Sequence, residues 1–401
     1  MWADLHPVGR SPDTSGYTRF AWSGADLACR EWFAAVATRR GLDITVDRNG
    51  NQWAWWGDPD SGDAVVTGSH LDSVPDGGAF DGPLGVVSAF AALDLLRDRG
   101  VRPVRPFAVV NFADEEGARF GVPCAGSRLM TGGLDHDRAR SLRDADGSTM
   151  AEAMSSAGHD PSHLGRDVET LGRIGTFVEL HVEQGRALVD FDAAVGVASS
   201  IRAHGRWRLD LHGEANHAGT TRLADRDDPM LRLAAAVLAA RESAEQRAAV
   251  ATIGKVHVRP GGTNAIPSLV RAWLDARGGD EQSVRRVVAA VGEAAGAELV
   301  EESWSPEVAF GHELREHVSG LLGGAPVLAT GAGHDAGVLA GAGVPTAMLF
   351  VRNPTGVSHS PAEHAETDDC LAGVEALATV LTDLLLTEQL GAESTDATET
   401  P

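Results

Sequence analysis

Five side chains in this sequence are of the kinds that bind divalent metal ions, and each follows or ends a stretch that predicts a β-strand. They are three histidines and two carboxylates, His70, Asp81, Glu116, His181 and His359. Imidazole nitrogens mixed with carboxylate oxygens suit zinc, manganese, cobalt or nickel. Open α/β sheets build their sites at the carboxyl ends of their strands, so one sheet can gather ligands that lie far apart in sequence. The pattern therefore predicts a dinuclear metal centre.

Two adjacent carboxylates, Glu115 and Glu116, follow the apolar run FAVVNFA at residues 107–113. Neighbouring carboxylates repel each other and are hard to remove from water together. The conflict disappears if one binds a metal ion and the other acts as a base on a metal-bound water. The plain alternative is a pair of glutamates in a solvated loop. Because the pair follows a buried strand directly, we favour the catalytic interpretation, in which one glutamate binds metal and the other is the base.

The surroundings of the other ligands are less specific when each is taken alone. Asp72 stands two residues after His70 and can hold the second nitrogen of its ring, which fixes the tautomer. Asp81 lies in the glycine-rich stretch DGGAFDG, where its two oxygens could bridge two cations or serve an ordinary turn. His181 shares a strand face with Glu179; the alternative is a solvent-facing antiparallel strand. The stretch GVSHSPAE carries His359, which would otherwise be a surface-loop histidine.

A second pair, His334 and Asp335, stands between glycines. We rank a metal role for it below a structural loop, because the five ligands already fill two sites.

These ligands require a sheet, and the sequence predicts one. Short apolar runs predict buried parallel strands at residues 64–68, 107–113, 176–182 and 347–351. Periodic apolar residues predict helices at 26–40 and 85–96, and Asn49-Gly50 predicts a hairpin within 44–56. Alternating strands and helices indicate an α/β fold, a mostly parallel sheet with helices on both faces.

The middle of the chain follows another pattern. Residues 206–212, 250–258, 269–276 and 298–304 predict strands, and residues 229–245 and 281–295 predict helices. This βαββαβ order indicates a small α+β domain inserted into the larger one. We expect a discontinuous catalytic domain at 1–200 and 313–390, the inserted domain at 201–312, and a disordered tail at 391–401.

Composition narrows the class of protein. The 401 residues include 43% hydrophobic and 23% charged residues, with a net charge of −23. A strongly acidic surface repels nucleic acid and anionic membranes. The amino terminus lacks the apolar stretch of a secretory signal and no run is long enough to span a bilayer, so we expect a cytoplasmic protein. Three widely spaced cysteines, Cys29, Cys124 and Cys370, predict reduced thiols and no disulfide framework.

From about residue 17 to 386 the sequence resembles the metal-dependent amidohydrolases that cut ureido groups. These are the N-carbamoyl-L-amino acid hydrolases, β-ureidopropionases and allantoate amidohydrolases of the wider M20 metallopeptidase-like group. The matching stretches, in chain order, are GSHLDSVPDGGAFDGPLGV, DEEGARFGVPCAGSRLMTG, FVELHVEQG, GEANHAGTT, PGGTNAIP, LDAR, GAGHDA and GVSHSPAE. Eight such stretches in order make the resemblance highly specific.

The resemblance implies a role for each ligand. His70 and His181 would bind one metal ion, Asp81 would bridge, and Glu116 and His359 would bind the second ion. Glu115 would be the general base. M20 peptidases usually carry a carboxylate where His181 stands, so this histidine points to the ureido-cleaving branch. The implied cofactors are two divalent ions per subunit, zinc first, with manganese, cobalt or nickel as alternatives.

The resemblance also implies substrate contacts from Gln184, His217, Asn264 and Arg277. The last three lie in the inserted domain, which the family uses for dimerisation and as a lid, and some reach the active site of the partner subunit. From the residues alone, the Arg277 fork suits a substrate carboxylate, and His217 could stabilise an oxyanion. The alternatives are a strand-end surface arginine, a loop histidine without a role, and an asparagine that serves a turn.

We therefore expect a homodimeric hydrolase that cleaves the ureido C–N bond of an N-carbamoyl-L-amino acid, β-ureidopropionate or allantoate. The products would include ammonia and carbon dioxide. One alternative is an M20 peptidase or aminoacylase that cuts an acyl amide. The other is a dimeric metal-binding scaffold without activity.

Overall fold

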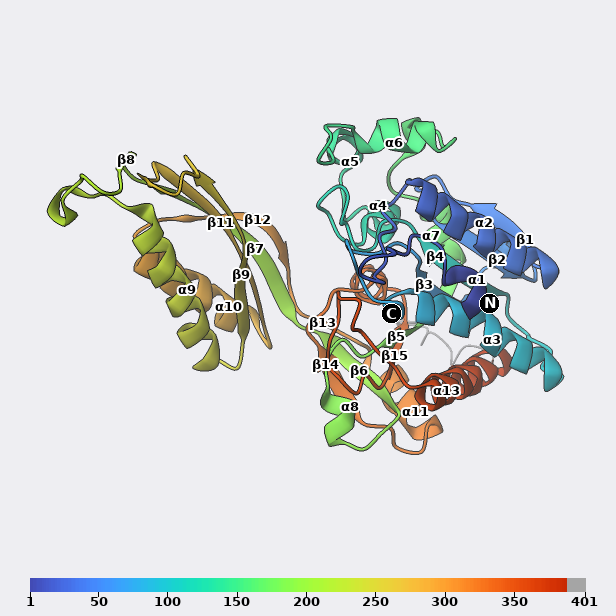
Figure 1. Cartoon of the computed structure of the whole chain (residues 1–401). Helices are drawn as coiled ribbons and strands as arrows, with labels where there is room; N and C mark the ends of the chain where they lie inside the picture. The colour runs from blue at the N-terminus through green and yellow to red at the C-terminus, as the bar shows by residue number, and fades with distance from the viewer. Residues whose placement is uncertain (388–401) are drawn as a thin grey trace, which may run out of the picture. The chain divides into compact units, whose positions relative to one another are not determined.

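The computed structural model describes residues 1–387, which form two compact units (Figure 1). Within the described residues, unit 1 contains Met1–Ser199 and residues 310–387, and unit 2 contains Ser200–Ala309. The boundaries expected from the sequence are residues 201 and 312. The expected disordered tail, residues 391–401, lies outside the described residues.

The larger sheet has nine strands, with β1-β2-β4-β3-β5-β15-β6-β13 as its order and β14 paired to β6. Its four central strands, β4, β3, β5 and β15, run parallel. On one side of these four strands, β2 pairs antiparallel with β4, and β1 pairs antiparallel with β2. On the other side, β6 pairs antiparallel with β15, and β13 pairs antiparallel with β6. The prediction of a mostly parallel sheet is confirmed for the centre, and the antiparallel edges add to it. The strand bounds are β1 Asp43–Val46, β2 Gln52–Trp56, β3 Ala64–His70, β4 Phe107–Phe112, β5 Ile174–Val182, β6 Val195–Ile201, β13 Val308–Ala309, β14 Val327–Thr330 and β15 Thr346–Val351.

Helices cover both faces of this sheet. Val178 and Leu180 of β5 belong to the core shared with α2 (Gly24–Arg39), α3 (Pro83–Asp98) and α13 (Thr367–Leu386). Successive side chains of a strand point to opposite faces, so Glu179 lies on the other face. There its carboxylate accepts the backbone N–H of Ala336 at 3.0 Å, in the first turn of α12 (Asp335–Gly341).

The sequence left several shorter helices unassigned. They are α1 Trp2–Leu5, α4 Ala125–Thr131, α5 His136–Ser141, α6 Met150–Ser156, α7 Val168–Arg173, α8 Ala187–Asp190 and α11 His312–Leu321. Among the described residues, no helix has the length and apolar character needed to cross a bilayer.

Unit 2 has the expected βαββαβ order. Its antiparallel sheet runs β12-β7-β11-β9, and α9 and α10 cover one face, where Trp207, Leu209 and Leu274 are buried. The bounds are β7 Ala203–His212, α9 Pro229–Glu245, β9 Val250–Arg259, β11 Leu269–Gly278, α10 Glu281–Ala295 and β12 Leu299–Ser305. In the chain, β8 (Asn216–His217) follows β7, and β10 (Ala265–Ile266) precedes β11. These two short strands pair with each other as a separate two-stranded sheet.

Candidate metal centre and active site

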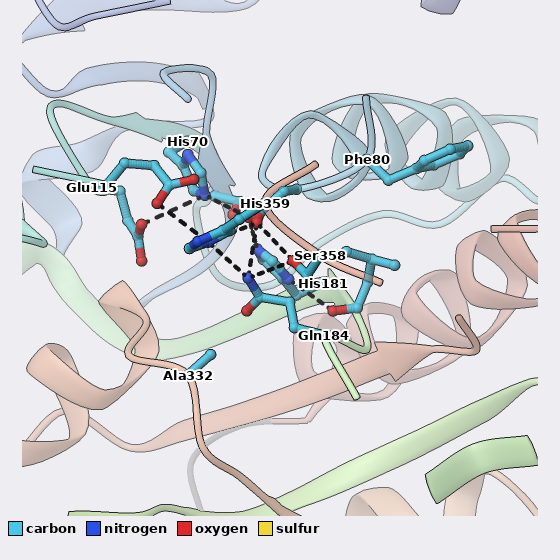
Figure 2. Close-up of polar contacts among 12 residues, drawn as sticks. His70, Phe80, Glu115, His181, Gln184, Ala332, Ser358 and His359 are labelled. Carbon is cyan, nitrogen blue, oxygen red and sulfur yellow. Dashed lines mark hydrogen bonds and ion pairs between the residues drawn. The ribbon is translucent and has the colours of Figure 1, made fainter. Parts of the chain in front are cut away.

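The parallel strands deliver the candidate ligands to one edge of the sheet. His70 is the last residue of β3, and His181 is the penultimate residue of β5. Glu116 follows β4, and His359 lies in the loop after β15. Figure 2 shows the imidazoles of His70, His181 and His359 converging. The fifth residue, Asp81, comes from the loop between β3 and α3.

The carboxylate of Asp81 is common to two sets of ligands. Its Oδ1 lies 3.6 Å from His70 Nε2 and 3.2 Å from His181 Nε2. Its Oδ2 lies 3.3 Å from His359 Nε2, which is 3.6 Å from a carboxylate oxygen of Glu116. Within each set, the candidate ligand atoms all lie within 4.8 Å of one another. The five residues are thus brought together as two groups of three that share Asp81.

The orientation of two imidazoles fits a metal centre. His70 Nδ1 lies 3.1 Å from the carbonyl oxygen of Asp72, and His181 Nδ1 lies 2.9 Å from that of Val182. A carbonyl only accepts, so each Nδ1 carries the proton and each Nε2 presents its lone pair to Asp81. Both Nε2 atoms are buried and have no hydrogen-bond partner within residues 1–387. Buried polar atoms are rarely left unpaired, and a cation would satisfy both.

The electrostatics of the cluster also fit bound cations. Burial, reinforced by Asp81, raises the pKa of Glu116 to about 7. A hydrogen bond to Asp81 raises the pKa of His359 to about 9. Burial opposes ionisation of Asp81 itself, but the imidazoles of His181, His359 and His70 around its carboxylate hold the pKa of this group well below the usual range. Acidic groups that are buried together require compensating positive charge, which divalent ions supply.

Glu115 belongs to neither ligand group. One of its carboxylate oxygens lies 3.7 Å from His70 Nε2, and the other lies 3.6 Å from the Cys124 thiol. Burial raises the pKa of Glu115 well above its usual range, against the opposing effect of His70. In Figure 2 its side chain reaches the edge of the cluster beside His70. The geometry leaves Glu115 available for proton transfer.

Asp72 supports the turn that carries the two glutamates. Asp114 adopts a left-handed conformation with φ of 54°, which turns the chain sharply after β4. The carboxylate oxygens of Asp72 then accept the backbone N–H groups of Glu115 at 3.2 Å and Glu116 at 3.1 Å. The sequence predicts that Asp72 holds the ring of His70. Its backbone carbonyl does so at 3.1 Å, whereas its carboxylate lies 3.5 Å from the same Nδ1.

Gln184 lies inside the cluster. Its side-chain amide donates to Asp81 Oδ2 at 2.8 Å and to Ser358 Oγ at 3.2 Å. Figure 2 shows Gln184 beside Ser358 and His359. Gln184 therefore contacts the residues that would hold the ions.

Two polar residues at this edge of the sheet, Ser358 and Glu363, were not predicted from the sequence to take part in the site. The carboxylate of Glu363 accepts the backbone N–H groups of Phe80 and Asp81 at 2.9 and 3.0 Å. Ser358 lies between Asp81 and Glu363. The only signal was that both stand within GVSHSPAE, next to a candidate ligand.

The pair His334 and Asp335 lies against the cluster. His334 is buried, its ring centroid is 4.5 Å from that of His181, and its nitrogens have no hydrogen-bond partner in the described part of the chain. With Glu179 and His181 it forms a third group of close ligand atoms. Asp335 accepts the hydroxyl of Ser127. The loop is therefore part of the site's wall.

The remaining candidate residues lie in unit 2, at opposite ends of its sheet. His217 pairs with Ala265 in the two-stranded sheet, and the carbonyl of Asn264 accepts the N–H of Ala218 at 2.9 Å. His217 and Asn264 are thus neighbours. Arg277 lies at the other end of β11, whose ten residues extend about 30 Å at ~3.3 Å per residue. No small molecule can touch both ends of this sheet.

The side chains of His217 and Arg277 are both held in place by hydrogen bonds to neighbouring groups. His217 Nδ1 accepts the backbone N–H groups of Gly219 at 3.0 Å and Thr220 at 3.2 Å. Its Nε2 therefore carries the proton and can donate outward. Arg277 donates through Nε and one terminal nitrogen to the two oxygens of Asp275, at 2.8 and 3.1 Å.

Comparison with known proteins identifies the family of this chain. The model of peptidase family M20/M25/M40 matches residues 66–383. The N-carbamoyl-L-amino acid amidohydrolase of Geobacillus stearothermophilus is 36% identical over 392 residues, which cover 93% of this chain and 94% of that protein. The allantoate amidohydrolase of Escherichia coli (strain K12) is 31% identical over 400 residues, 95% of each chain. The crystal structure of an amidase of the hydantoinase/carbamoylase family from Burkholderia vietnamiensis matches with a TM-score of 0.87 at 28% identity, over 96% of this chain and 95% of that one. The chain belongs to peptidase family M20/M25/M40, in its hydantoinase/carbamoylase branch, and is a hydrolase of non-peptide carbon–nitrogen bonds.

Proposed function

We propose that this protein is a dinuclear-metal amidohydrolase that cleaves the ureido C–N bond of an N-carbamoyl-L-amino acid or of allantoate. The observation that carries the proposal is the carboxylate of Asp81, whose two oxygens face two different sets of ligands. The activities named for the relatives, N-carbamoyl-L-amino acid amidohydrolase and allantoate amidohydrolase, support the substrate class. Both substrates pair a carboxylate with a ureido group.

His70, Asp81 and His181 would hold one ion, and Asp81, Glu116 and His359 would hold the other. When bound, a pair of divalent ions lowers the pKa of water and polarises a carbonyl oxygen. Zinc is the first candidate, because buried imidazoles and carboxylates suit it, and manganese, cobalt or nickel are alternatives.

Glu115 moves the protons of the reaction. It takes a proton from the attacking water as the water oxygen bonds to the carbamoyl carbon, and it delivers a proton to the leaving nitrogen as the C–N bond breaks. Burial raises the pKa of Glu115, which makes its carboxyl a better acceptor for the proton that it later returns to the leaving nitrogen. The carbamate that is released breaks down to ammonia and carbon dioxide.

Four residues would bind the substrate. Arg277 would hold its carboxylate, since a guanidinium fork matches a carboxylate in a bidentate manner. His217 would donate from Nε2 to the oxygen that becomes negative, a role supported by the two N–H groups that occupy its Nδ1. Gln184 and Asn264 would orient the substrate through their amides.

We further propose a homodimer, because one chain cannot bring Arg277 and the pair of His217 and Asn264 to a single substrate. A second copy of the chain would supply the residues from the end of the sheet that the first copy cannot bring to the substrate. The surface formed by α9 and β9 is suited to this contact. Leu231 and Leu238 of α9 are 72% and 71% exposed, and β9 is the last strand in the order of its sheet. An exposed strand edge beside an apolar helix face can pair with its own copy about a twofold axis.

The proposal is tested by measuring ammonia release from three ureido acids, an N-carbamoyl-L-amino acid, β-ureidopropionate and allantoate. The protein is loaded in turn with zinc, manganese, cobalt or nickel. An N-acetyl-L-amino acid and a dipeptide are assayed separately for comparison, and their cleavage is measured as the release of free amine. We expect turnover of at least one ureido acid at least ~100-fold above that of the acyl amides. Faster cleavage of the acyl amides would contradict the proposal and favour a peptidase or aminoacylase.

A further inference from the structure

The side chain of Glu363 joins two loops that are far apart in sequence. It lies in the segment between β15 and α13, four residues beyond His359, and is 5% exposed. One carboxylate oxygen accepts the backbone N–H groups of Phe80 at 2.9 Å and Asp81 at 3.0 Å. The other accepts the hydroxyl of Ser358 at 3.2 Å.

The loop that carries Asp81 depends on such outside contacts. It runs between β3 and α3, is rich in glycine, and has few groups of its own that could fix its shape. Two adjacent N–H groups that converge on one carboxylate oxygen hold the peptide groups of the loop in place, most strongly when the carboxylate is ionised. These bonds orient the peptide groups next to the Asp81 side chain. Glu363 therefore sets the direction in which Asp81 presents its carboxylate.

Gly78 is fitted to this contact. A Cβ atom at Gly78 would lie 2.2 Å from a carboxylate oxygen of Glu363. Only glycine permits the backbone to approach the carboxylate so closely. On the neighbouring residue, Gly77 exchanges backbone hydrogen bonds of 2.8 and 3.0 Å with Tyr17. The loop is held from two directions.

Ser358 extends the contact to the second loop. Its Oγ lies 3.2 Å from Glu363 and 3.4 Å from Asp81 Oδ2, and it accepts the amide of Gln184 at 3.2 Å. Ser358 is also the residue directly before His359. Glu363 thus contacts both the loop that carries Asp81 and the residue directly before His359.

We propose that Glu363 is a positioning residue that fixes the separation of Asp81 and His359 and thereby sets the affinity of the site for its divalent ions. It would act through Asp81 and Ser358, which its carboxylate contacts. The inference rests on the proposed function, because it requires that Asp81 and His359 bind metal.

The test compares Glu363→Ala, Glu363→Gln and Glu366→Gln with the wild type. Glutamine keeps one oxygen for the two N–H groups but replaces the acceptor of Ser358 with an amide group. Glu366 is an exposed acid three residues away, paired with His364 at 3.2 Å, and serves as the matched control. Each protein is stripped with a chelator and titrated with zinc against a chromophoric chelator, which gives the number of ions bound and their affinities. Thermal unfolding is recorded with and without zinc.

Loss of a group that orients ligands lowers metal affinity by roughly 10–100-fold. We expect this for Glu363→Ala, a smaller loss for Glu363→Gln, and wild-type affinity for Glu366→Gln. The rise in melting temperature on adding zinc should be largest for the wild type and Glu366→Gln, smaller for Glu363→Gln and smallest for Glu363→Ala. A residue with only a structural role would lower the melting temperature with and without zinc alike. Either that result or two ions bound by Glu363→Ala with wild-type affinity would overturn the inference.

The failure of this inference can be told from that of the proposed function. If the wild type binds two ions and cleaves a ureido acid but Glu363→Ala binds them equally well, only the inference fails. If the wild type binds no divalent ion, both fail.

Discussion

The carboxylate of Asp72 accepts the backbone N–H of Glu115 at 3.2 Å, across 43 residues of sequence. Its second oxygen accepts the N–H of Glu116 at 3.1 Å. One side chain in the loop just after β3 therefore fixes the turn at the end of β4, where the proposed base and a proposed ligand stand side by side. The two neighbouring parallel strands are coupled at the point where the chemistry would occur.

This contact predicts the effect of Asp72→Asn. Asparagine has one acceptor oxygen, so one of the two N–H groups would face an amide donor and remain unpaired. We expect the free energy of unfolding to fall by about 1–3 kcal/mol, and kcat to fall by roughly 10–100-fold. Chemical denaturation and steady-state kinetics measure both. Asp94→Asn, which removes a half-exposed acid paired with Arg40, is the control and should keep kcat. Unchanged kcat in Asp72→Asn would show that the turn holds its shape without this carboxylate.

Glu115→Gln separates proton transfer from metal binding. Glutamine has nearly the same shape but cannot accept and return a proton, so kcat should fall by at least ~100-fold while both ions remain bound. Glu116→Gln is the matched variant at the next residue, and it should lose affinity for one ion. Metal content is measured by elemental analysis and turnover by ammonia release. Near-normal turnover by Glu115→Gln would rule out its role as the base.

Much of this site could be predicted because its ligands follow buried strands. His70 and Glu116 each come at or just after a short apolar run, and such runs are recognisable without tertiary information. The parallel order of the strands then requires their ends to meet. The interactions of Glu363 could not be predicted in this way. Its contact with Asp81 spans 282 residues and depends on the path of two irregular loops, which no periodicity records.

The same limit applies to the inserted unit. The βαββαβ order was readable from the sequence, but the separation of Arg277 from His217 depends on strand register. Arg277 pairs with His204 near the start of β7, whereas β8, which carries His217, comes after its end. Register follows from side-chain packing across the sheet, so only the structure locates the two residues at opposite ends.

Arg277→Ala tests recognition of the substrate carboxylate. We expect KM for carboxylate substrates to rise by roughly 10–100-fold, the loss of a charged hydrogen-bonded pair, with a smaller change in kcat. Arg277→Lys should lie between, because lysine keeps the charge but not the fork. The control is Arg271→Ala on the same strand, where Arg271 pairs with Asp210, and its KM should stay within about threefold of the wild type. Equal KM for Arg271→Ala and Arg277→Ala would remove Arg277 from the substrate site.

Asp335 gives the protein a specific dependence of stability on pH. Burial, with Glu179 adding to it, raises the pKa of Asp335 to about 8. In the unfolded chain the value is about 4, so between pH 4 and 8 the folded chain keeps a proton that the unfolded chain has lost. The contribution of this group is therefore full below about pH 4 and is lost as the pH rises through 8, by up to about 1.4 kcal/mol per pH unit.

Asp335→Asn removes that dependence. Urea unfolding of the metal-free protein at pH 5.5, 6.5 and 7.5 should give a shallower decline of the unfolding free energy than in the wild type, by about 1 kcal/mol per pH unit. Asp368→Asn, at an exposed position in the first turn of α13, should decline in parallel with the wild type. Parallel declines of Asp335→Asn and the wild type would show that Asp335 is ionised throughout this range.

Mixing two inactive variants tests whether a second copy completes the active site. Glu115→Gln keeps an intact His217, and His217→Ala keeps an intact Glu115. If His217 of the partner subunit acts on each site, a mixed dimer has one site with both groups and one with neither. Random exchange of equal amounts makes about half of the dimers mixed, so activity should recover to about a quarter of the wild-type value. The variants are unfolded together, refolded and assayed for ammonia release, with each variant refolded alone as the control. If His217 instead acts within its own chain, both sites of the mixed dimer lack one group, and the mixture stays as inactive as its components.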